Sequence, residues 1–159
     1  MRLFTVSECL CRNLRRIPAW GDESFSDMAA VATENYISGK NKWEIGREIK
    51  KDEGALRYLD NPRKDGRSID NYKDFDDTEG HGAAGITNKA FYLLATSKGW
   101  TVRKAFNVMV KANMNYWTSS TKTFNEAACG VVAATKDYGY NVADVRVAFA
   151  KVGIDTDNC

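Results

Sequence analysis

Histidine is almost absent from this sequence, since His81 is the only one among 159 residues. A catalytic zinc ion is normally held by three protein side chains, and two or three of these are commonly His or Cys. One histidine cannot be both a metal ligand and an acid-base group. The chain is therefore either not a metalloenzyme or only one part of one.

The sequence also has no strong charge excess and no long apolar segment. The net charge is +2, and basic and acidic residues alternate, as in residues 63–67 (RKDGR), so no basic stripe suggests a nucleic-acid partner. No apolar run approaches the roughly 18 residues that a membrane helix needs. In residues 1–16 three of the four arginines come late, after the short apolar pieces, which differs from the order in a signal peptide. We expect no nucleic-acid partner, no membrane partner and no signal peptide in this chain.

Cysteine is scarce, with four residues in two groups. Cys9 and Cys11 are too close for a Cys-x-x-Cys redox motif, and their simplest interpretation is two free thiols. Cys159 ends a polar tail that could fold back toward Cys129, although four cysteines allow three pairings. Such a bridge would close a loop of about 30 residues, which corresponds to roughly 3 to 4 kcal/mol of chain entropy. It would also imply an oxidising compartment.

The spacing of apolar residues predicts a mainly α-helical domain. The length is that of one globular domain, and 43% of the residues are hydrophobic, which is enough for a core. Apolar residues recur at helical spacing, and strand signals are scarce. We expect helices over residues 22–39, 86–98, 102–113, 127–135 and 143–152.

Capping residues support three of these helices. Thr101 and Asn141 are suitable N-caps, and Thr123 with Glu126 forms a capping-box sequence. Residues 60–85 instead form a polar, Gly-rich stretch that predicts a long irregular connection. A connection of this length within a compact domain is usually functional or disordered, and this one contains His81.

Two acidic residues, Glu23 and Asp27, are separated by one helical turn. Their carboxylates therefore project from the same helix face, about 6 Å apart along the axis. In one interpretation they are solvated acids that suit the dipole of the first helical turn. In the other, one carboxylate is a metal ligand and the second lies behind it and orients the site. Their spacing alone does not decide between the two.

His81 and Arg57 are the other candidate site residues. Glu79 precedes His81 by two residues, and a carboxylate bonded to one ring nitrogen would leave the other nitrogen free to donate to a developing negative charge. The simpler interpretation is an exposed loop histidine. Arg57 has apolar neighbours on both sides, which suits a partly buried guanidinium that orients carboxylates or carbonyls, or else a structural ion pair.

Several motifs carry a family resemblance. Residues 23–28 (ESFSDM) resemble the Glu-x-x-x-Asp helix of the thermolysin-like zinc metalloendopeptidases. Other segments look like the vibriolysin and pseudolysin branch of that family, namely residues 54–58, 65–71, 85–94, 116–118 and 128–131. The match runs from about residue 21 to residue 159 and covers only the C-terminal helical domain of the family. The resemblance thus implies the fold of that domain for residues 21–159.

The resemblance also implies roles for individual side chains. Glu23 matches the third zinc ligand, and Asp27 matches the acid that orients a zinc-binding histidine. His81 matches the histidine that stabilises the tetrahedral oxyanion, with Glu79 in the place of its partner carboxylate. Arg57 matches the arginine that binds the substrate carbonyl. Zinc is the cofactor that these matches imply for the complete family enzyme.

Further implications concern specificity, covalent structure and location. Leu56 and Ile45 would line the S1′ pocket, which favours a large apolar residue after the scissile bond. The family's C-terminal disulfide corresponds to Cys129 and Cys159. The family is secreted, so the resemblance implies an extracellular protein.

The sequence departs from the family in several places. The His-Glu-x-x-His helix, which supplies two zinc ligands and the general base, is absent because there is no second histidine. Residues 1–20 match no family segment, and we expect them to be disordered or non-native. In the calcium region Val31 and Lys42 stand where carboxylates are expected, so calcium has far weaker support than zinc.

We therefore interpret the chain as the C-terminal half of a secreted zinc metalloendopeptidase that is inactive alone. Its expected partners are the missing N-terminal catalytic domain and a protein or peptide substrate. The unmatched start suggests a truncated or frame-shifted gene. The alternatives are a free-standing domain that binds peptides or a full-length protease, and complementation by a separate chain that carries the missing half.

Overall fold

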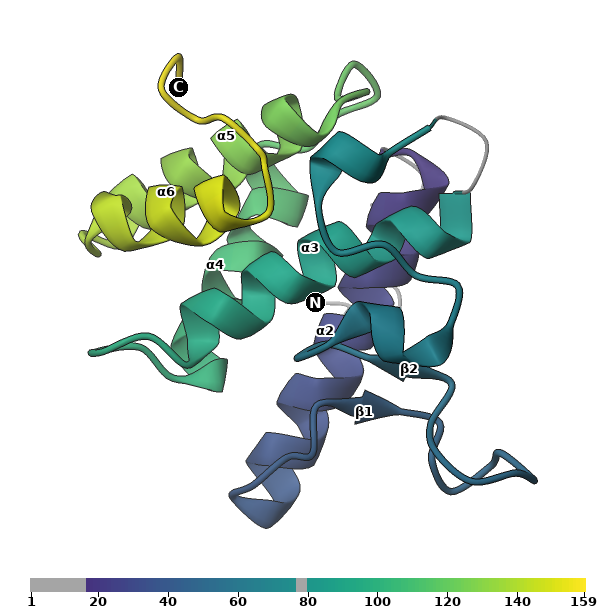
Figure 1. Ribbon diagram of the computed structural model, residues 1–159. Coiled ribbons are helices and arrows are strands. Elements are labelled where there is room, and N and C mark those ends of the chain that lie inside the picture. Colours follow the sequence, from purple (N-terminus) through teal and green to yellow (C-terminus); the bar gives the residue numbers. More distant parts are fainter. Residues whose placement is uncertain (1–16, 77–79) are drawn as a thin grey trace, which may run out of the picture.

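The computed structural model describes residues 17–76 and 80–159, and these residues fold into a helical domain, as the sequence predicts (Figure 1). Helix α3 runs through the middle of the fold; α4, α5 and α6 gather on one side of it, and a short β-ribbon lies on the other side beside α2. The helices are α2 (Ala19–Ser38), α3 (Gly80–Ala95), α4 (Val102–Asn115), α5 (Phe124–Asp137) and α6 (Val142–Lys151). The ribbon pairs β1 (Glu44–Ile45) with β2 (Arg57–Tyr58) in antiparallel register, and two 3-10 helices follow, η1 (Pro62–Asp65) and η2 (Tyr72–Asp74).

Helix α2 begins three residues earlier than the sequence pattern predicts. Pro18 precedes its first residue, and Gly39 ends it in a left-handed conformation with φ of +71°. A glycine adopts this conformation without steric cost. Ile17 and Trp20 are both buried, and the Trp20 ring stacks on Phe124 with centroids 3.8 Å apart. Packing against the core thus starts before residue 21, while the expectation for residues 1–16 lies outside the described part of the chain.

Helix α3 also begins earlier than predicted, at Gly80 rather than at Ile86. The glycines around His81 suggest a loop, because glycine is a poor helix former. Gly85 has a packing reason to be glycine, because a Cβ atom there would collide with the backbone oxygen of Ile69. Tertiary contact with the preceding connection therefore overrides the local preference. As a result, His81 lies in the first turn of a helix and not in the irregular connection.

The three C-terminal helices have the predicted caps. The Thr101 side chain accepts a hydrogen bond from the Lys104 amide, and the Asn141 side chain accepts one from the Ala143 amide. At α5 both hydrogen bonds of the capping box between Thr123 and Glu126 are present. These bonds confirm the three caps; α4 and α6 begin within one residue of the predicted position, whereas α5 begins at Phe124, three residues before the predicted start at residue 127.

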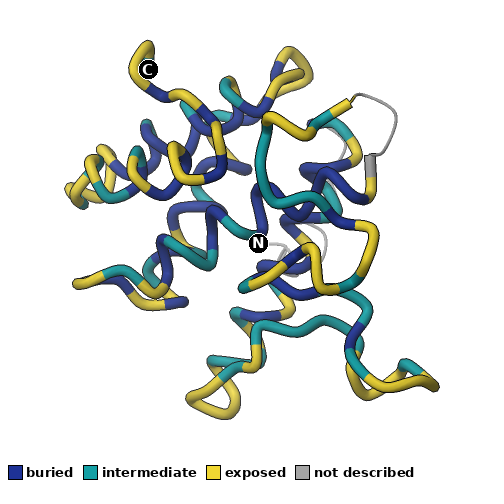
Figure 2. The backbone as a smooth tube through the Cα atoms, viewed as in Figure 1, coloured by how far each residue is buried: buried dark blue, intermediate teal, exposed yellow. Residues whose placement is uncertain are grey.

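A single hydrophobic core fills the space where the helices meet (Figure 2). Its largest fully buried side chains are Phe91, Phe124, Leu59, Ile86, Leu94, Met109 and Ile154. The tail after α6 returns to this core through Ile154, and a disulfide joins Cys159 to Cys129 with an S–S distance of 2.05 Å. Cys9 and Cys11 lie outside the described residues. Within the described ranges, no helix is both long enough and apolar enough to span a bilayer.

Candidate functional site

A buried ion pair between α2 and β2 forms the base of the candidate site. Arg57 donates from Nε to Asp27 Oδ2 over 2.7 Å and from Nη2 to Asp27 Oδ1 over 2.6 Å. Asp27 is only 2% exposed, whereas the Arg57 side chain is 29% exposed. Two parallel charge-assisted hydrogen bonds fix the orientation of both groups. One edge of the guanidinium is therefore held in the protein, and its remaining N–H groups are left for other acceptors.

Asn88 of α3 adds a third donor to the same carboxylate. Its Nδ2 donates to Asp27 Oδ2 over 2.8 Å, and the residue is 1% exposed. Asn88 belongs to residues 85–94, one of the segments that carry the family resemblance, and its sequence context alone predicts no role for it. A signal was present, because Asn88 is an amide among the apolar residues of α3, between the buried Ile86 and Ala90.

Glu23 lies above the buried pair, at the open side of the site. One of its oxygens, Oε2, is 3.5 Å from Arg57 Nη2, and the other, Oε1, is 3.2 Å from His81 Nδ1. The Glu23 side chain is 33% exposed and the His81 side chain 82% exposed. The fold thus brings Arg57 of β2 and His81 of α3 to the two acids of α2, with Asp27 and Arg57 beneath and Glu23 and His81 at the surface.

The charges of the site shift two ionisations. The hydrogen bond from Arg57 to Asp27 raises the pKa of the guanidinium, so Arg57 stays positively charged at any physiological pH. Burial, and secondarily the charge of neighbouring Glu23, raises the pKa of Asp22. Asp22 Oδ1 is buried and has no hydrogen-bond partner in residues 17–76 and 80–159. A charge on Asp22 is therefore poorly compensated, unlike the charge on Asp27.

The residues of this chain do not fit a catalytic zinc ion by themselves. Within the described ranges, no three His, Cys, Asp or Glu side chains are close enough to share a metal ion. Glu23 and His81 face each other, and a catalytic zinc needs three protein ligands. In the calcium region, Val31 is buried in the core, and the Glu34 carboxylate accepts a hydrogen bond from the Lys42 backbone N–H over 3.4 Å. Among the described residues of this region, no three carboxylates are close enough to share a calcium ion.

The remaining predicted site residues lie on or near the β-ribbon. The Leu56 backbone N–H donates to the carbonyl of Ile45 over 2.8 Å, so these two residues are adjacent and precede Arg57. Both are partly buried, which leaves apolar surface beside the ion pair. Glu79, the predicted partner of His81, lies outside the described residues.

An open hollow of about 320 Å³ lies directly beside Arg57 and His81. Its other lining residues are Asp65, Arg67, Ser68 and Gly82. The Asp65 carboxylate is engaged locally, because Oδ1 accepts from the backbone amides of Arg67 and Ser68 and Oδ2 accepts from the Ser68 hydroxyl. The hollow has a polar, hydrogen-bonding wall next to the exposed imidazole. A peptide segment could therefore lie against it.

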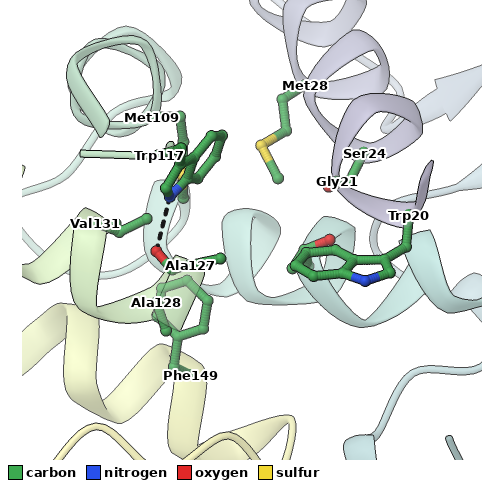
Figure 3. A pocket seen from close by; sticks show the side chains of 11 residues that line it. Trp20, Gly21, Ser24, Met28, Met109, Trp117, Ala127, Ala128, Val131 and Phe149 are labelled. Atoms are coloured by element: carbon green, nitrogen blue, oxygen red, sulfur yellow. Dashed lines mark hydrogen bonds between the residues drawn. The ribbon is translucent and has the colours of Figure 1, made fainter. Parts of the chain in front are cut away.

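A second cavity lies inside the core and is too small for a substrate (Figure 3). Its volume is about 20 Å³, and Met28 points toward it from α2. On another wall the Trp117 indole donates from Nε1 to the Ala127 carbonyl over 2.9 Å, while Ser24 Oγ has no partner. The volume is close to that of a single water molecule, and the walls are mostly apolar. This internal cavity therefore has no room for a peptide.

Comparison with known proteins gives consistent matches over the helical domain. Residues 21–154 match the family "Thermolysin metallopeptidase, alpha-helical domain". The chain is 48% identical over 142 residues to a zinc metalloproteinase of Legionella pneumophila, covering 87% of this chain and 26% of that protein. It is 49% identical over 135 residues to a neutral protease of Vibrio proteolyticus, covering 84% and 22%, and 46% identical over 134 residues to a zinc metalloprotease of Helicobacter pylori, covering 84% and 52%. The chain therefore spans about a quarter of the first two relatives and about half of the third.

Proposed function

Because the chain belongs to the thermolysin metallopeptidase family, as its α-helical domain, we propose that it is the helical half of a zinc-dependent endopeptidase. The other zinc ligands and the general base would lie outside these 159 residues, in a longer form of the protein or in a second chain. The observation that carries the proposal is the cluster of Glu23, Asp27, Arg57 and His81, which four hydrogen bonds or close ion pairs connect.

Three side chains of the cluster each suit one task in peptide-bond hydrolysis. Glu23 is partly exposed and could serve as one metal ligand, which is too few to bind zinc tightly alone. The N–H groups of Arg57 that do not bind Asp27 could donate to a peptide carbonyl and hold it in place. The exposed His81 imidazole could donate to the oxyanion that develops on that carbonyl. Alone, these residues bind and orient a peptide but hold no base that activates water, so we expect negligible turnover.

The β-ribbon suggests a preference for apolar side chains in the substrate. Leu56 and Ile45 are adjacent and partly buried, and they precede the proposed carbonyl-binding Arg57. An apolar residue placed after the scissile bond would remove their exposed surface from water. We propose that the complete enzyme prefers a large apolar residue at this position.

The disulfide and the relatives support an extracellular location. Disulfides form and persist mainly in oxidising environments, and Cys129–Cys159 is such a bridge. One relative is a hemagglutinin/proteinase of Vibrio cholerae, 46% identical over 135 residues. We propose that the complete protein acts outside the cell.

A domain exchange tests the proposed function. Residues 21–159 would replace the corresponding segment of the Vibrio proteolyticus neutral protease, with the helical domain of the Legionella pneumophila relative as a control for the exchange itself. We expect a chimera that binds zinc and hydrolyses casein. Removal of the oxyanion donor in His81→Ala should lower its kcat by about 10²- to 10³-fold with little change in KM. An inactive, folded chimera beside an active control would overturn the proposal.

A second candidate is a peptide- or protease-binding domain without catalysis. The hollow of about 320 Å³ beside the exposed His81 favours it, because this surface is accessible in the chain as it stands. Titration of the isolated chain with casein peptides distinguishes the two functions. Saturable binding together with a failed domain exchange would favour the binding domain.

A further inference from the structure

The geometry points to Asn88 as a positioning residue that selects which oxygen of Asp27 can bind a group from outside the chain. This inference rests on the proposed function, because the outside group is the metal-binding histidine of the missing half. Asn88 touches neither substrate nor metal in this arrangement. It acts through Asp27, to which its side-chain amide donates over 2.8 Å.

The Asp27 carboxylate can accept only a limited number of hydrogen bonds. An ionised carboxylate has about four lone-pair positions, two on each oxygen. Oδ2 accepts from both Arg57 Nε and Asn88 Nδ2, so its two positions are filled. Oδ1 accepts from Arg57 Nη2, and the described residues provide no second donor to it. Any further donor therefore has to approach Oδ1.

Without Asn88, either oxygen of Asp27 could accept an additional donor. Asp27 is 2% exposed, so a donor can reach it only from a narrow range of directions. A histidine that binds a metal usually donates its other ring N–H to a carboxylate or carbonyl, and this bond fixes the orientation of the ring. By filling the last position on Oδ2, Asn88 leaves one position and hence one orientation for such a ring.

The other end of Asn88 shows that the amide is not there for core packing. Asn88 Oδ1 is buried and has no partner among the described residues, and a buried unsatisfied acceptor lowers the stability of the fold. An apolar side chain of similar size would avoid this cost. The hydrogen bond to Asp27 is the feature of the site that requires an amide donor here.

Asn113 provides a matched control on α4. It is also a buried asparagine, 3% exposed, with its Nδ2 unpartnered, and none of the hydrogen bonds to Asp27 comes from it. Substitution of either residue by leucine removes one buried amide from the core. Only Asn88→Leu removes a donor from Asp27.

The test measures zinc affinity in the domain-exchange chimera. We expect Asn88→Leu to weaken zinc binding by about 10-fold, the low end of the effect of losing the direct partner of a metal ligand, because Asn88 acts one residue further from the metal. Asn113→Leu should keep the zinc affinity within about twofold of that of the unsubstituted chimera, even if its melting temperature shifts more than that of Asn88→Leu. Equal zinc affinities in the two variants would overturn the inference. If either leucine variant fails to fold, Asn88→Ala and Asn113→Ala provide the same comparison.

A measurement on the isolated chain separates this inference from the proposed function. If the unsubstituted chimera binds no zinc, the proposed function fails, and the role of Asn88 toward a metal-binding group fails with it. If that chimera binds zinc, NMR of the isolated chain checks the hydrogen bond itself. One side-chain amide proton of Asn88 should exchange slowly, and Asp27→Ala, which removes the acceptor, should abolish this protection. Fast exchange in the unsubstituted chain would contradict the geometry on which the inference depends.

Discussion

Two regions of the molecule are stabilised in different ways. One is the layer formed by α4, α5 and α6; the other, called the edge below, carries the cluster of Glu23, Asp27, Arg57 and His81. In the layer, apolar side chains such as Val108, Val132 and Val145 are completely buried, and caps within each helix satisfy the backbone. At the edge, a buried carboxylate depends on donors from two other elements, Arg57 on β2 and Asn88 on α3. The layer therefore stabilises the fold, whereas holding charged groups in place at the edge lowers that stability.

Removal of the disulfide should have the largest effect on the free energy of unfolding, and this bridge belongs to the helical layer. Cys129→Ala with Cys159→Ala opens a loop of 30 residues, and we expect the free energy of unfolding to fall by about 3 to 4 kcal/mol. Urea unfolding with and without a reductant measures this change. Cys9→Ala with Cys11→Ala is the control and should unfold like the parent. A reductant that leaves the parent unchanged would show that the layer does not need the bridge.

Removal of Arg57 tests how much its ion pair with Asp27 contributes to the stability of the fold. Arg57→Ala would leave the Asp27 carboxylate buried with only Asn88 as a donor, and we expect a loss of about 3 kcal/mol because an unpaired buried charge is costly. Arg63→Ala is the matched control, because Arg63 also pairs with two acids, Asp70 and Asp74, but is 52% exposed. Exposed pairs contribute about 0 to 1 kcal/mol. Equal losses in the two variants, measured by urea unfolding, would show that the edge pair is not special.

A smaller effect is expected at the start of α5. Thr123→Ala removes one half of the capping box, and a lost N-cap typically costs about 1 kcal/mol. Thr123→Ser keeps a hydroxyl acceptor and serves as the control. Thermal unfolding should rank the parent and the serine variant above the alanine variant. An alanine variant as stable as the parent would mean that packing, not capping, determines where this helix begins.

The smallest expected effect is a pH-dependent increase in the free energy of unfolding when Asp22 is replaced. The pKa of Asp22 is raised above its ordinary value of 3.8, mainly by burial, so ionisation of this group destabilises the fold. The cost is absent below pH 3.8 and grows as the pH rises through the folded-state pKa. Asp22→Asn should therefore be more stable than the parent at pH 7 and equal to it at pH 3. Asp52→Asn at an exposed position is the control, and a gain of equal size at both pH values would contradict the assigned cause.

Local signals in the sequence predict the helices of the layer better than they predict contacts between distant segments. Helical periodicity and caps are local signals, so they predict the caps of α4, α5 and α6 and, to within one residue, the starts of α4 and α6. The start of α3 was missed because the glycines around His81 weaken the local helix signal, while the reason for Gly85 is a contact with Ile69 from another segment.

The candidate site was predictable in its members but not in its connections. The family resemblance named Glu23, Asp27, Arg57 and His81, and the fold brings these four together. No pattern in the sequence shows that Asn88 reaches Asp27, because the two are 61 positions apart and meet only when α2 packs on α3. Hydrogen bonds of this kind depend on tertiary packing, which single-chain periodicity does not contain.

Zinc binding measured side by side in the isolated chain and in the domain-exchange chimera tests the central claim most directly. The claim is that this chain supplies one carboxylate ligand, Glu23, and that the remaining ligands come from outside these residues. We predict one tightly bound zinc ion per chimera and no stoichiometric zinc in the isolated chain, which should also leave casein uncut. Stoichiometric zinc with casein hydrolysis by the isolated chain would contradict the account.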